Sequence, residues 1–389
     1  MVGSTLALLL AQQRLRVALC VQPPRPAAAA TATATATASP GPEPGPDGHS
    51  DIRAYALNTA SRQLLESVRA WPEEGLPPER QPPVTPVERM EVQGDQGGAL
   101  TFSALTSGTP ALNWMVDVPA LEARLADALK FQSGVQVLRG TDAPPPAPLT
   151  VICEGRRSAT RAEWGLDYEV KAYPHHAVAA RLTLPAPHQG VARQWFSQGE
   201  IMALLPLGGE GGQDAALVWS VPADKARHLL TLPGHEFLAD MAQVCQLDAS
   251  QMRLTHAPRS WPLELSQASR WVLPGVALAG DAAHAMHPLA GQGLNMGLGD
   301  AAKLAQVIQQ REYWRSLGDI KLLRRYERAR KADFAAMGNL TDGLFNLFNQ
   351  DNKLVQQLRN WGMTGVNQVA PLKSWLTRQA MGHSDTAHR

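Results

Sequence analysis

The amino-acid sequence predicts an α/β protein with two structural units followed by a helical tail. Its 389 residues are enough for about two domains. Residues 4–21 and 276–308 each combine a strand-like apolar run with helical apolar spacing, whereas residues 177–221 hold short apolar segments bounded by Gly and Pro. The first two segments are typical of a Rossmann-like domain, and the third is typical of a separate antiparallel sheet.

Residues 280–300 carry the strongest functional signal. The apolar run 276–279 predicts a strand that ends at Asp281, and the apolar spacing that begins at Leu294 predicts a helix after the glycine turn 291–293. A carboxylate at a strand end can accept hydrogen bonds from sugar-like hydroxyls, and a glycine turn before a helix lets backbone N–H groups approach an anion. This arrangement suits a flavin, with Asp281 on the ribityl chain and the helix start at the ring edge that becomes negative on reduction.

The same ordered string contains Pro288, Gln292 and Asn295, and here the sequence resembles the FAD-dependent aromatic hydroxylases, the single-component flavoprotein monooxygenases. It is most similar to their ubiquinone-biosynthesis branch. An ordinary strand–turn–helix corner is the alternative, but such a corner does not need these three residues together with Asp281.

The resemblance implies a reaction and a set of site residues. NAD(P)H or another donor reduces FAD, O2 adds to the flavin, and the flavin hydroperoxide transfers OH to an aromatic ring, most simply that of a prenylated phenol in ubiquinone biosynthesis. The catalytic residues that it implies are His287, Pro288 and Gln292. The cofactor-binding residues that it implies are Gly3, Arg53, Glu154, Gly155, Arg161, Gly280, Asp281, Gly291, Gln292, Gly293, Leu294 and Asn295.

The N-terminal segment matches only half of a dinucleotide-binding βαβ unit. Residues 4–11 predict a helix and 16–21 a strand, and Gly3 corresponds to the third glycine of GxGxxG, so the first strand is missing. The acid expected after the second strand is replaced by Gln22. Two explanations compete: Met1 is an internal methionine of a longer chain, which we favour, or the protein lacks its pyrophosphate cradle and binds FAD weakly or not at all.

The next segment begins with low complexity and then regains helical spacing. Residues 27–48 are an Ala-Thr alternation followed by dense Pro and Gly, which predicts a flexible surface loop. Arg53 follows it and matches a family arginine that reaches the cofactor phosphates or the flavin ring. A solvated arginine at a helix start is the alternative.

A second fingerprint follows the predicted strand 149–153. Residues 154–161 resemble the family's acid–glycine pair with a following serine and arginine, which is associated with both FAD and the nicotinamide donor. Glu154 stands where aspartate is usual and is one methylene longer, whereas Gly155, Ser158 and Arg161 match. A strand-to-loop corner with basic surface residues is the alternative.

The middle of the chain predicts the substrate-binding unit. Residues 84–102 predict a hairpin, 118–129 a helix, and the region up to residue 254 a β-rich meander. Trp195, Phe196 and Trp219 could line an apolar pocket for a prenylated ring or could be core. The expected domains are an FAD-binding unit (1–83, 103–168 and 257–340), a β-sheet substrate unit (84–102 and 169–256) and a helical segment (341–389), whose apolar stripe 344–361 serves either core packing or a subunit or membrane-surface contact.

Composition narrows the remaining function classes. The 36 Lys and Arg residues nearly balance 35 Asp and Glu residues, so no basic field indicates nucleic-acid binding. The three cysteines form no CxxC, and His284 and His287 lack further ligands at metal spacing, so neither a metal site nor a disulfide framework is expected. Residues 6–11 are too short to span a bilayer. We expect a cytoplasmic protein, with a peripheral membrane contact, a contact with a quinone-synthesis assembly, or a homo-oligomer as further expectations.

Two alternative functions stay open at this point. One is a related hydroxylase that acts on another aromatic compound. The other is a degenerate, non-catalytic paralogue that acts as a binding or scaffold protein in a quinone-synthesis assembly, which Gln22 and Glu154 favour.

Overall fold

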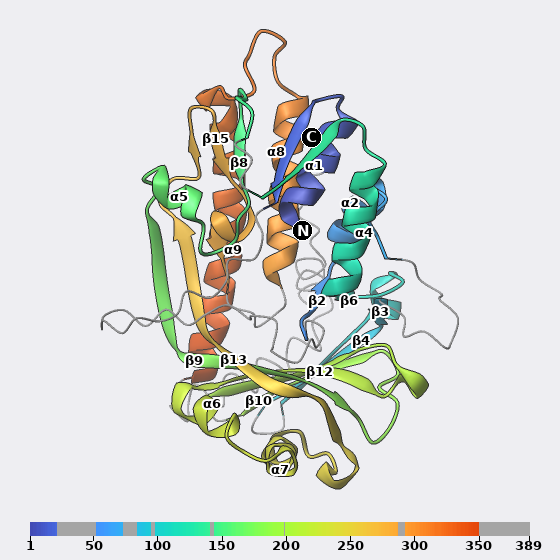
Figure 1. Cartoon of the computed structure of the whole chain (residues 1–389). Helices are drawn as coiled ribbons and strands as arrows, with labels where there is room; N and C mark the ends of the chain where they lie inside the picture. Colours follow the sequence, from blue (N-terminus) through green and yellow to red (C-terminus); the bar gives the residue numbers. More distant parts are fainter. Residues whose placement is uncertain are drawn as a thin grey trace.

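The computed structural model describes residues 1–21, 52–72, 84–94, 98–140, 144–197, 199–286 and 292–349. Figure 1 shows helices and small sheets in the upper part of the molecule and one large sheet below them. The elements of the first half are α1 (Val2–Gln12), β1 (Val17–Val21), β2 (Ala54–Leu57), α2 (Thr59–Ser67), β3 (Val84–Val87), β4 (Arg89–Gln93), β5 (Ala99–Ser103), α3 (Ala104–Ser107), β6 (Asn113–Asp117), α4 (Val118–Lys130), β7 (Val135–Arg139), β8 (Thr150–Ile152) and α5 (Ala159–Glu163).

The second half begins with the long strands of the large sheet and ends in two long helices. Its elements are β9 (Tyr168–Thr183), β10 (Val191–Ser197), β11 (Glu200–Pro206), β12 (Asp214–Pro222), α6 (Ala223–Leu229), α7 (Gly234–Cys245), β13 (Arg253–Ala268), β14 (Val272–Leu273), β15 (Val276–Leu278), β16 (His284–Ala285), α8 (Gln292–Gln309) and α9 (Ile320–Asn349). Short 3-10 turns lie at 210–212, 249–251 and 280–282.

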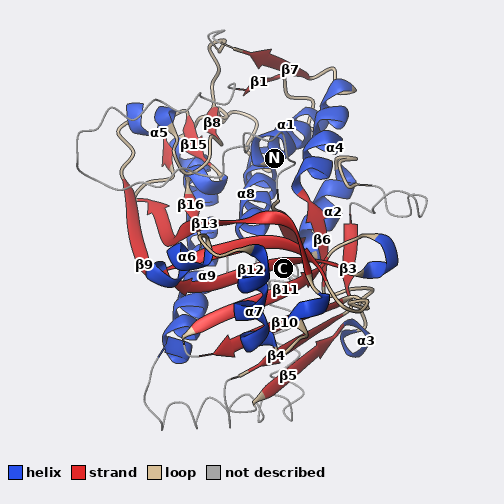
Figure 2. Ribbon diagram, turned by 60° about the horizontal axis from the view of Figure 1, so that its bottom comes forward, coloured by secondary structure: helices blue, strands red, loops and turns tan. Residues whose placement is uncertain are grey.

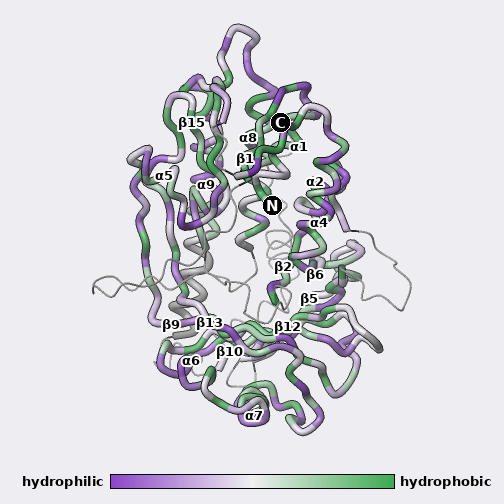
Figure 3. The backbone as a smooth tube through the Cα atoms, viewed as in Figure 1, coloured by the Kyte–Doolittle hydropathy of each residue, from purple (hydrophilic) through white to green (hydrophobic). Residues whose placement is uncertain are grey.

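The upper part is built from three small sheets and the helices around them. β1 pairs with β7 in parallel, β8 pairs in parallel with β15, which also pairs with β14, and β2, β6 and β3 form an antiparallel sheet. Leu6 and Leu10 of α1 pack in one core with Leu278, Leu304 and apolar residues of α9. Figure 3 shows hydrophobic stretches along α1, β15 and α8, as this shared core requires.

The lower part is one eight-stranded sheet in the order β16-β13-β9-β12-β11-β10-β4-β5. β9 and β13 are each 16 residues long and pair antiparallel across several register shifts, so the two strands run from the large sheet up to the strand end at 280. Helices α6 and α7 cover the lower face of the sheet (Figures 1 and 2). This fold confirms the predicted mixed α/β class with a large sheet and a helical C-terminal region.

The structure corrects three sequence predictions in this part. Residues 84–87 are not part of the hairpin, because they form β3 beside β6, and only β4 and β5 make the hairpin. Residues 223–245 form α6 and α7 rather than strands, since Phe237, Met241 and Cys245 are buried at helical spacing. The Trp195 and Trp219 side chains do not line a pocket, because both are buried in the core between the sheet and α7.

The low-complexity segment 27–48 and most of the C-terminal stripe lie outside the described residues. Within the described ranges no helix is both long and apolar enough to cross a membrane.

Candidate functional site

The candidate flavin site is centred on the turn after β15. Gly280 has a φ of +62°, which favours glycine, and a Cβ there would lie 3.2 Å from the side chain of Val2. A Cβ on Gly297 of α8 would lie 2.7 Å from the same side chain. The two glycines therefore allow the start of α1 and the start of α8 to meet at this strand end.

Asp281 faces an open recess at this turn. Its side chain is exposed to solvent, yet the surrounding protein desolvates the carboxyl and raises its pKa above the usual value. The positive charges of Arg156 and Arg53 act on the same carboxyl in the opposite direction. The structure thus brings together Arg53, Arg156 and Asp281 from three distant segments, as a cofactor site would require.

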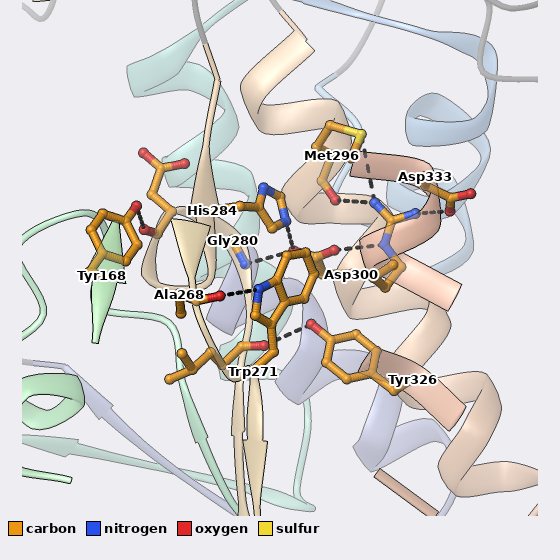
Figure 4. A network of polar contacts seen from close by, with 12 residues as sticks. Tyr168, Ala268, Trp271, Gly280, His284, Met296, Asp300, Tyr326 and Asp333 are labelled. Atoms are coloured by element: carbon orange, nitrogen blue, oxygen red, sulfur yellow. Dashed lines mark hydrogen bonds and ion pairs between the residues drawn. The ribbon is translucent and has the colours of Figure 1, made fainter. Parts of the chain in front are cut away.

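A buried charged network lies directly behind the turn (Figure 4). One carboxylate oxygen of Asp300 accepts a 2.9 Å hydrogen bond from the Gly280 N–H and lies 2.7 Å from Nε2 of His284, and the other accepts a 2.7 Å bond from Nε of Arg330. Burial by itself would raise the pKa of Asp300, but His284 and Arg330 outweigh it and hold that pKa below the usual value. His284 stacks on Trp271 with ring centroids 4.7 Å apart. The network therefore fixes the backbone of Gly280 and the ring of His284.

The second fingerprint is locked to the same turn. Arg161 is buried, and its guanidinium donates to the carbonyls of Ala282 at 3.0 Å and Arg156 at 2.9 Å. The guanidinium also lies 3.7 Å from the ring centre of Tyr168, whose hydroxyl donates to the Asp281 carbonyl at 2.9 Å. Arg161 therefore acts on the flavin turn through its backbone.

Glu154 is held within its own loop. Its carboxylate accepts hydrogen bonds from the hydroxyls of Ser158, at 2.7 Å, and Thr160. Burial would raise the pKa of Glu154, but these hydrogen bonds and the charge of Arg161 lower it overall. The carboxylate is thus ionised at neutral pH and shapes the turn that carries Gly155.

The segment that carries Arg53 is held from two sides. On one side, the Asn295 side-chain oxygen accepts from the Asn58 N–H at 3.0 Å and the Ser61 hydroxyl at 2.7 Å. On the other side, Arg181 of the large sheet donates to the carbonyl of Ile52 at 3.0 Å and to that of Arg53 at 3.3 Å, and it pairs with Asp117. These bonds fix the Arg53 backbone relative to both α8 and the large sheet.

The remaining predicted residues differ in how directly they face the recess. A Cβ on Gly155 or Gly293 would meet no atom within 4 Å, so both positions leave room for a ligand. Leu294 is buried in the core, and Gly3 packs closely against Cys153. His287, Pro288, Gly291 and the side chain of Gln292 lie outside the described residues.

These residues fit a bound flavin dinucleotide. An acid at a strand end, an open glycine at a helix start and two arginines beside the acid supply acceptors for hydroxyls and positive charge for phosphates. In the described ranges no three His, Cys, Asp or Glu side chains are grouped as metal ligands would be.

Sequence reasoning missed the residues that hold the site rather than line it, namely Asp300, Arg330, Tyr168 and Arg181. Only Asp300 left a signal: it is an acid next to Ala301 on the apolar side of the predicted helix, a position that a solvated acid would avoid.

Comparison with known proteins agrees with this site. Residues 134–339 match the family described as FAD binding domain. The chain is 30% identical over 353 residues to the ubiquinone hydroxylase UbiL of Rhodospirillum rubrum, covering 85% of this chain and 80% of that protein. It is 26% identical over 356 residues to the 3-demethoxyubiquinol 3-hydroxylase of Escherichia coli, covering 86% and 88% of the two chains.

A solved structure with a similar fold is p-nitrophenol 4-monooxygenase PnpA from Pseudomonas putida DLL-E4. It superposes with a TM-score of 0.70 over 99% of this chain and 96% of that chain, at 16% identity. The fold and site therefore define a flavin-dependent oxygenase. The chain belongs to the FAD-binding flavoprotein monooxygenase family, as the sequence motifs predicted.

Proposed function

We propose that this protein is an FAD-dependent hydroxylase that acts on a prenylated phenol in ubiquinone biosynthesis. The observation that carries the proposal is the flavin recess at Asp281 within a chain that is similar along most of its length to a ubiquinone hydroxylase. The reductant is NAD(P)H or another donor, and the oxidant is O2.

The residues of the recess have separate tasks in this proposal. The Asp281 carboxylate accepts hydrogen bonds from the ribityl hydroxyls, and the first turn of α8 at Gly293 stabilises negative charge on the ring edge. Arg53 and Arg156 offset phosphate charge, and His287, Pro288 and Gln292 complete the ring side. When bound, FAD supplies the redox chemistry with O2 that gives the hydroxylating power.

The first test is the visible absorption spectrum of the purified chain with and without added FAD. We expect a protein-bound flavin spectrum and a higher Tm in the presence of FAD. Hydroxylation is then measured by mass spectrometry of a prenylated phenol after incubation with NAD(P)H and labelled O2. Bound flavin with unlabelled phenol would refute the substrate but not the cofactor.

A non-catalytic paralogue that serves as a scaffold in a quinone-synthesis assembly is the second candidate. It is favoured by Glu154, whose carboxylate is engaged by Ser158 and Thr160 within its own loop. On this alternative the purified chain is colourless and its Tm does not respond to FAD.

A further inference from the structure

The connection between α8 and α9 exposes two large aromatic side chains. Tyr313 is 93% and Trp314 is 69% exposed, and their rings meet edge to face with centroids 5.1 Å apart. Exposed aromatic residues that contribute nothing to a core indicate an interaction surface. In Figure 1 this connection is the orange loop at the top of the molecule, at the opposite end from the large sheet.

A third exposed aromatic residue lies at the same end. Phe131, which follows α4, is 87% exposed. The nearby Gly134 packs against Ala11 at the end of α1, and Gln13 donates a 2.9 Å hydrogen bond to the Ala305 carbonyl near the end of α8. The C-terminal ends of α1, α4 and α8 therefore gather around these aromatic side chains.

The same end is strongly basic. Residues 311–331 contain eight Lys or Arg residues against three Asp or Glu residues, in a chain whose total charge is nearly balanced. Two of those acids are neutralised locally, because Glu312 pairs with Arg315 and Arg325 and Asp319 pairs with Arg315. The exposed cations recur at helical spacing on one face of α9, at Lys321, Arg324, Arg325 and Arg328.

An ion pair connects the basic face to the aromatic loop. Arg325 on α9 lies 2.6 Å from a carboxylate oxygen of Glu312, the residue directly before Tyr313. The aromatic side chains and the cations of α9 therefore belong to one surface, which we call the α8–α9 surface (Phe131, Tyr313, Trp314, Lys321, Arg324, Arg325 and Arg328).

We propose that the α8–α9 surface docks on an anionic phospholipid membrane. Tyr and Trp side chains favour the headgroup region of a bilayer, and each nearby cation is attracted to anionic lipid. The rings of Tyr313 and Trp314 project almost fully into solvent rather than lining a groove with aliphatic neighbours, which suits insertion between headgroups better than packing against a protein. The proposal does not depend on the reaction assigned above.

Vesicle flotation of the full chain tests this proposal. Vesicles of phosphatidylcholine alone are compared with vesicles of equal parts phosphatidylcholine and phosphatidylglycerol, at low and high salt. We expect the wild-type protein to float with the anionic vesicles at low salt and to be released by salt. A wild-type protein that stays at the bottom of the gradient with both vesicles overturns the proposal.

Variants separate this surface from others. We expect the double variant Tyr313→Ser/Trp314→Ser to lose flotation and each of Lys321→Gln, Arg324→Gln and Arg328→Gln to lower partitioning about fivefold. Trp164→Ser is the matched control, since Trp164 is 49% exposed beside α5; it should float like the wild type.

Two further results would also overturn the proposal. One is equal flotation of the double variant and the control. The other is a change in oligomeric state of the double variant on gel filtration with unchanged flotation, which would assign the surface to a second copy of the chain. Far-UV circular dichroism and Tm of each variant establish that it is folded.

Discussion

Replacing Asp300 by asparagine should be the most destabilising single polar substitution at this site. The Asp300 side chain is fully buried, and its two oxygens accept from three donors: the Gly280 N–H, His284 Nε2 and Arg330 Nε. Asparagine has the same shape but only one acceptor oxygen, so at least one of these donors would face an NH2 group. Arg330, which is 9% exposed, would then lose its buried counter-charge.

The magnitude follows from the burial of this pair. Breaking a buried ion pair by removing one partner costs about 3–5 kcal/mol, a large part of the roughly 5–15 kcal/mol by which a protein is stable. Asp333 provides the matched control, because it pairs with the same Arg330 but is 51% exposed. We expect Asp333→Asn to cost less than about 1 kcal/mol.

Urea unfolding followed by circular dichroism measures both variants. The reasoning is refuted if Asp300→Asn and Asp333→Asn lower the free energy of unfolding by similar amounts. A large loss for Asp300→Asn alone would show that burial, rather than the number of contacts to Arg330, sets the energy.

Three other predictions follow from the same geometry. Because the pKa of Asp300 is lowered in the folded protein, its stabilising contribution is present above the ordinary aspartate pKa of 3.8 and is lost as pH falls through the lowered value, so urea curves of wild type and Asp300→Asn should converge in acid. Asn295→Ala removes the hydrogen bonds to the α2 cap and should cost about 2–4 kcal/mol of unfolding free energy in the same assay, whereas a loss below about 1 kcal/mol would contradict the assigned bonds. Burial raises the pKa of Cys153 to about 12, so a thiol reagent should modify the exposed Cys20 first, and rapid labelling of Cys153 in the folded protein, read by peptide mass spectrometry, would contradict that burial.

The sequence was a good guide wherever a local pattern determines structure. The strand that ends at Gly280, the helix that follows it and the α1–β1 pair were all predictable from apolar spacing and glycine. The spacing of Phe237 and Met241 also indicates a helix, and α7 was missed because the surrounding strands favoured a β interpretation.

Long-range side-chain roles could not be predicted in the same way. Arg161 and Arg181 bond backbone carbonyls that lie 121 and 129 residues away, and no local pattern specifies such a partner. The environment of Trp219 was equally hidden, because alternation along a strand separates the two faces without saying which of them meets α7.

The two acids of the flavin motif should affect the cofactor in different ways. Asp300 is fully buried and its charge is compensated by Arg330 and His284, so it acts on the recess by holding the Gly280 backbone rather than through its field. Asp281 is exposed and carries no such clamp, so Asp281→Asn should weaken FAD binding about 10- to 100-fold with little change in unfolding free energy. For Asp300→Asn, flavin affinity and stability should fall together. Titration of both variants with FAD beside urea unfolding separates a ligand-binding acid from a positioning one, and a loss of stability in Asp281→Asn equal to that in Asp300→Asn would remove the distinction.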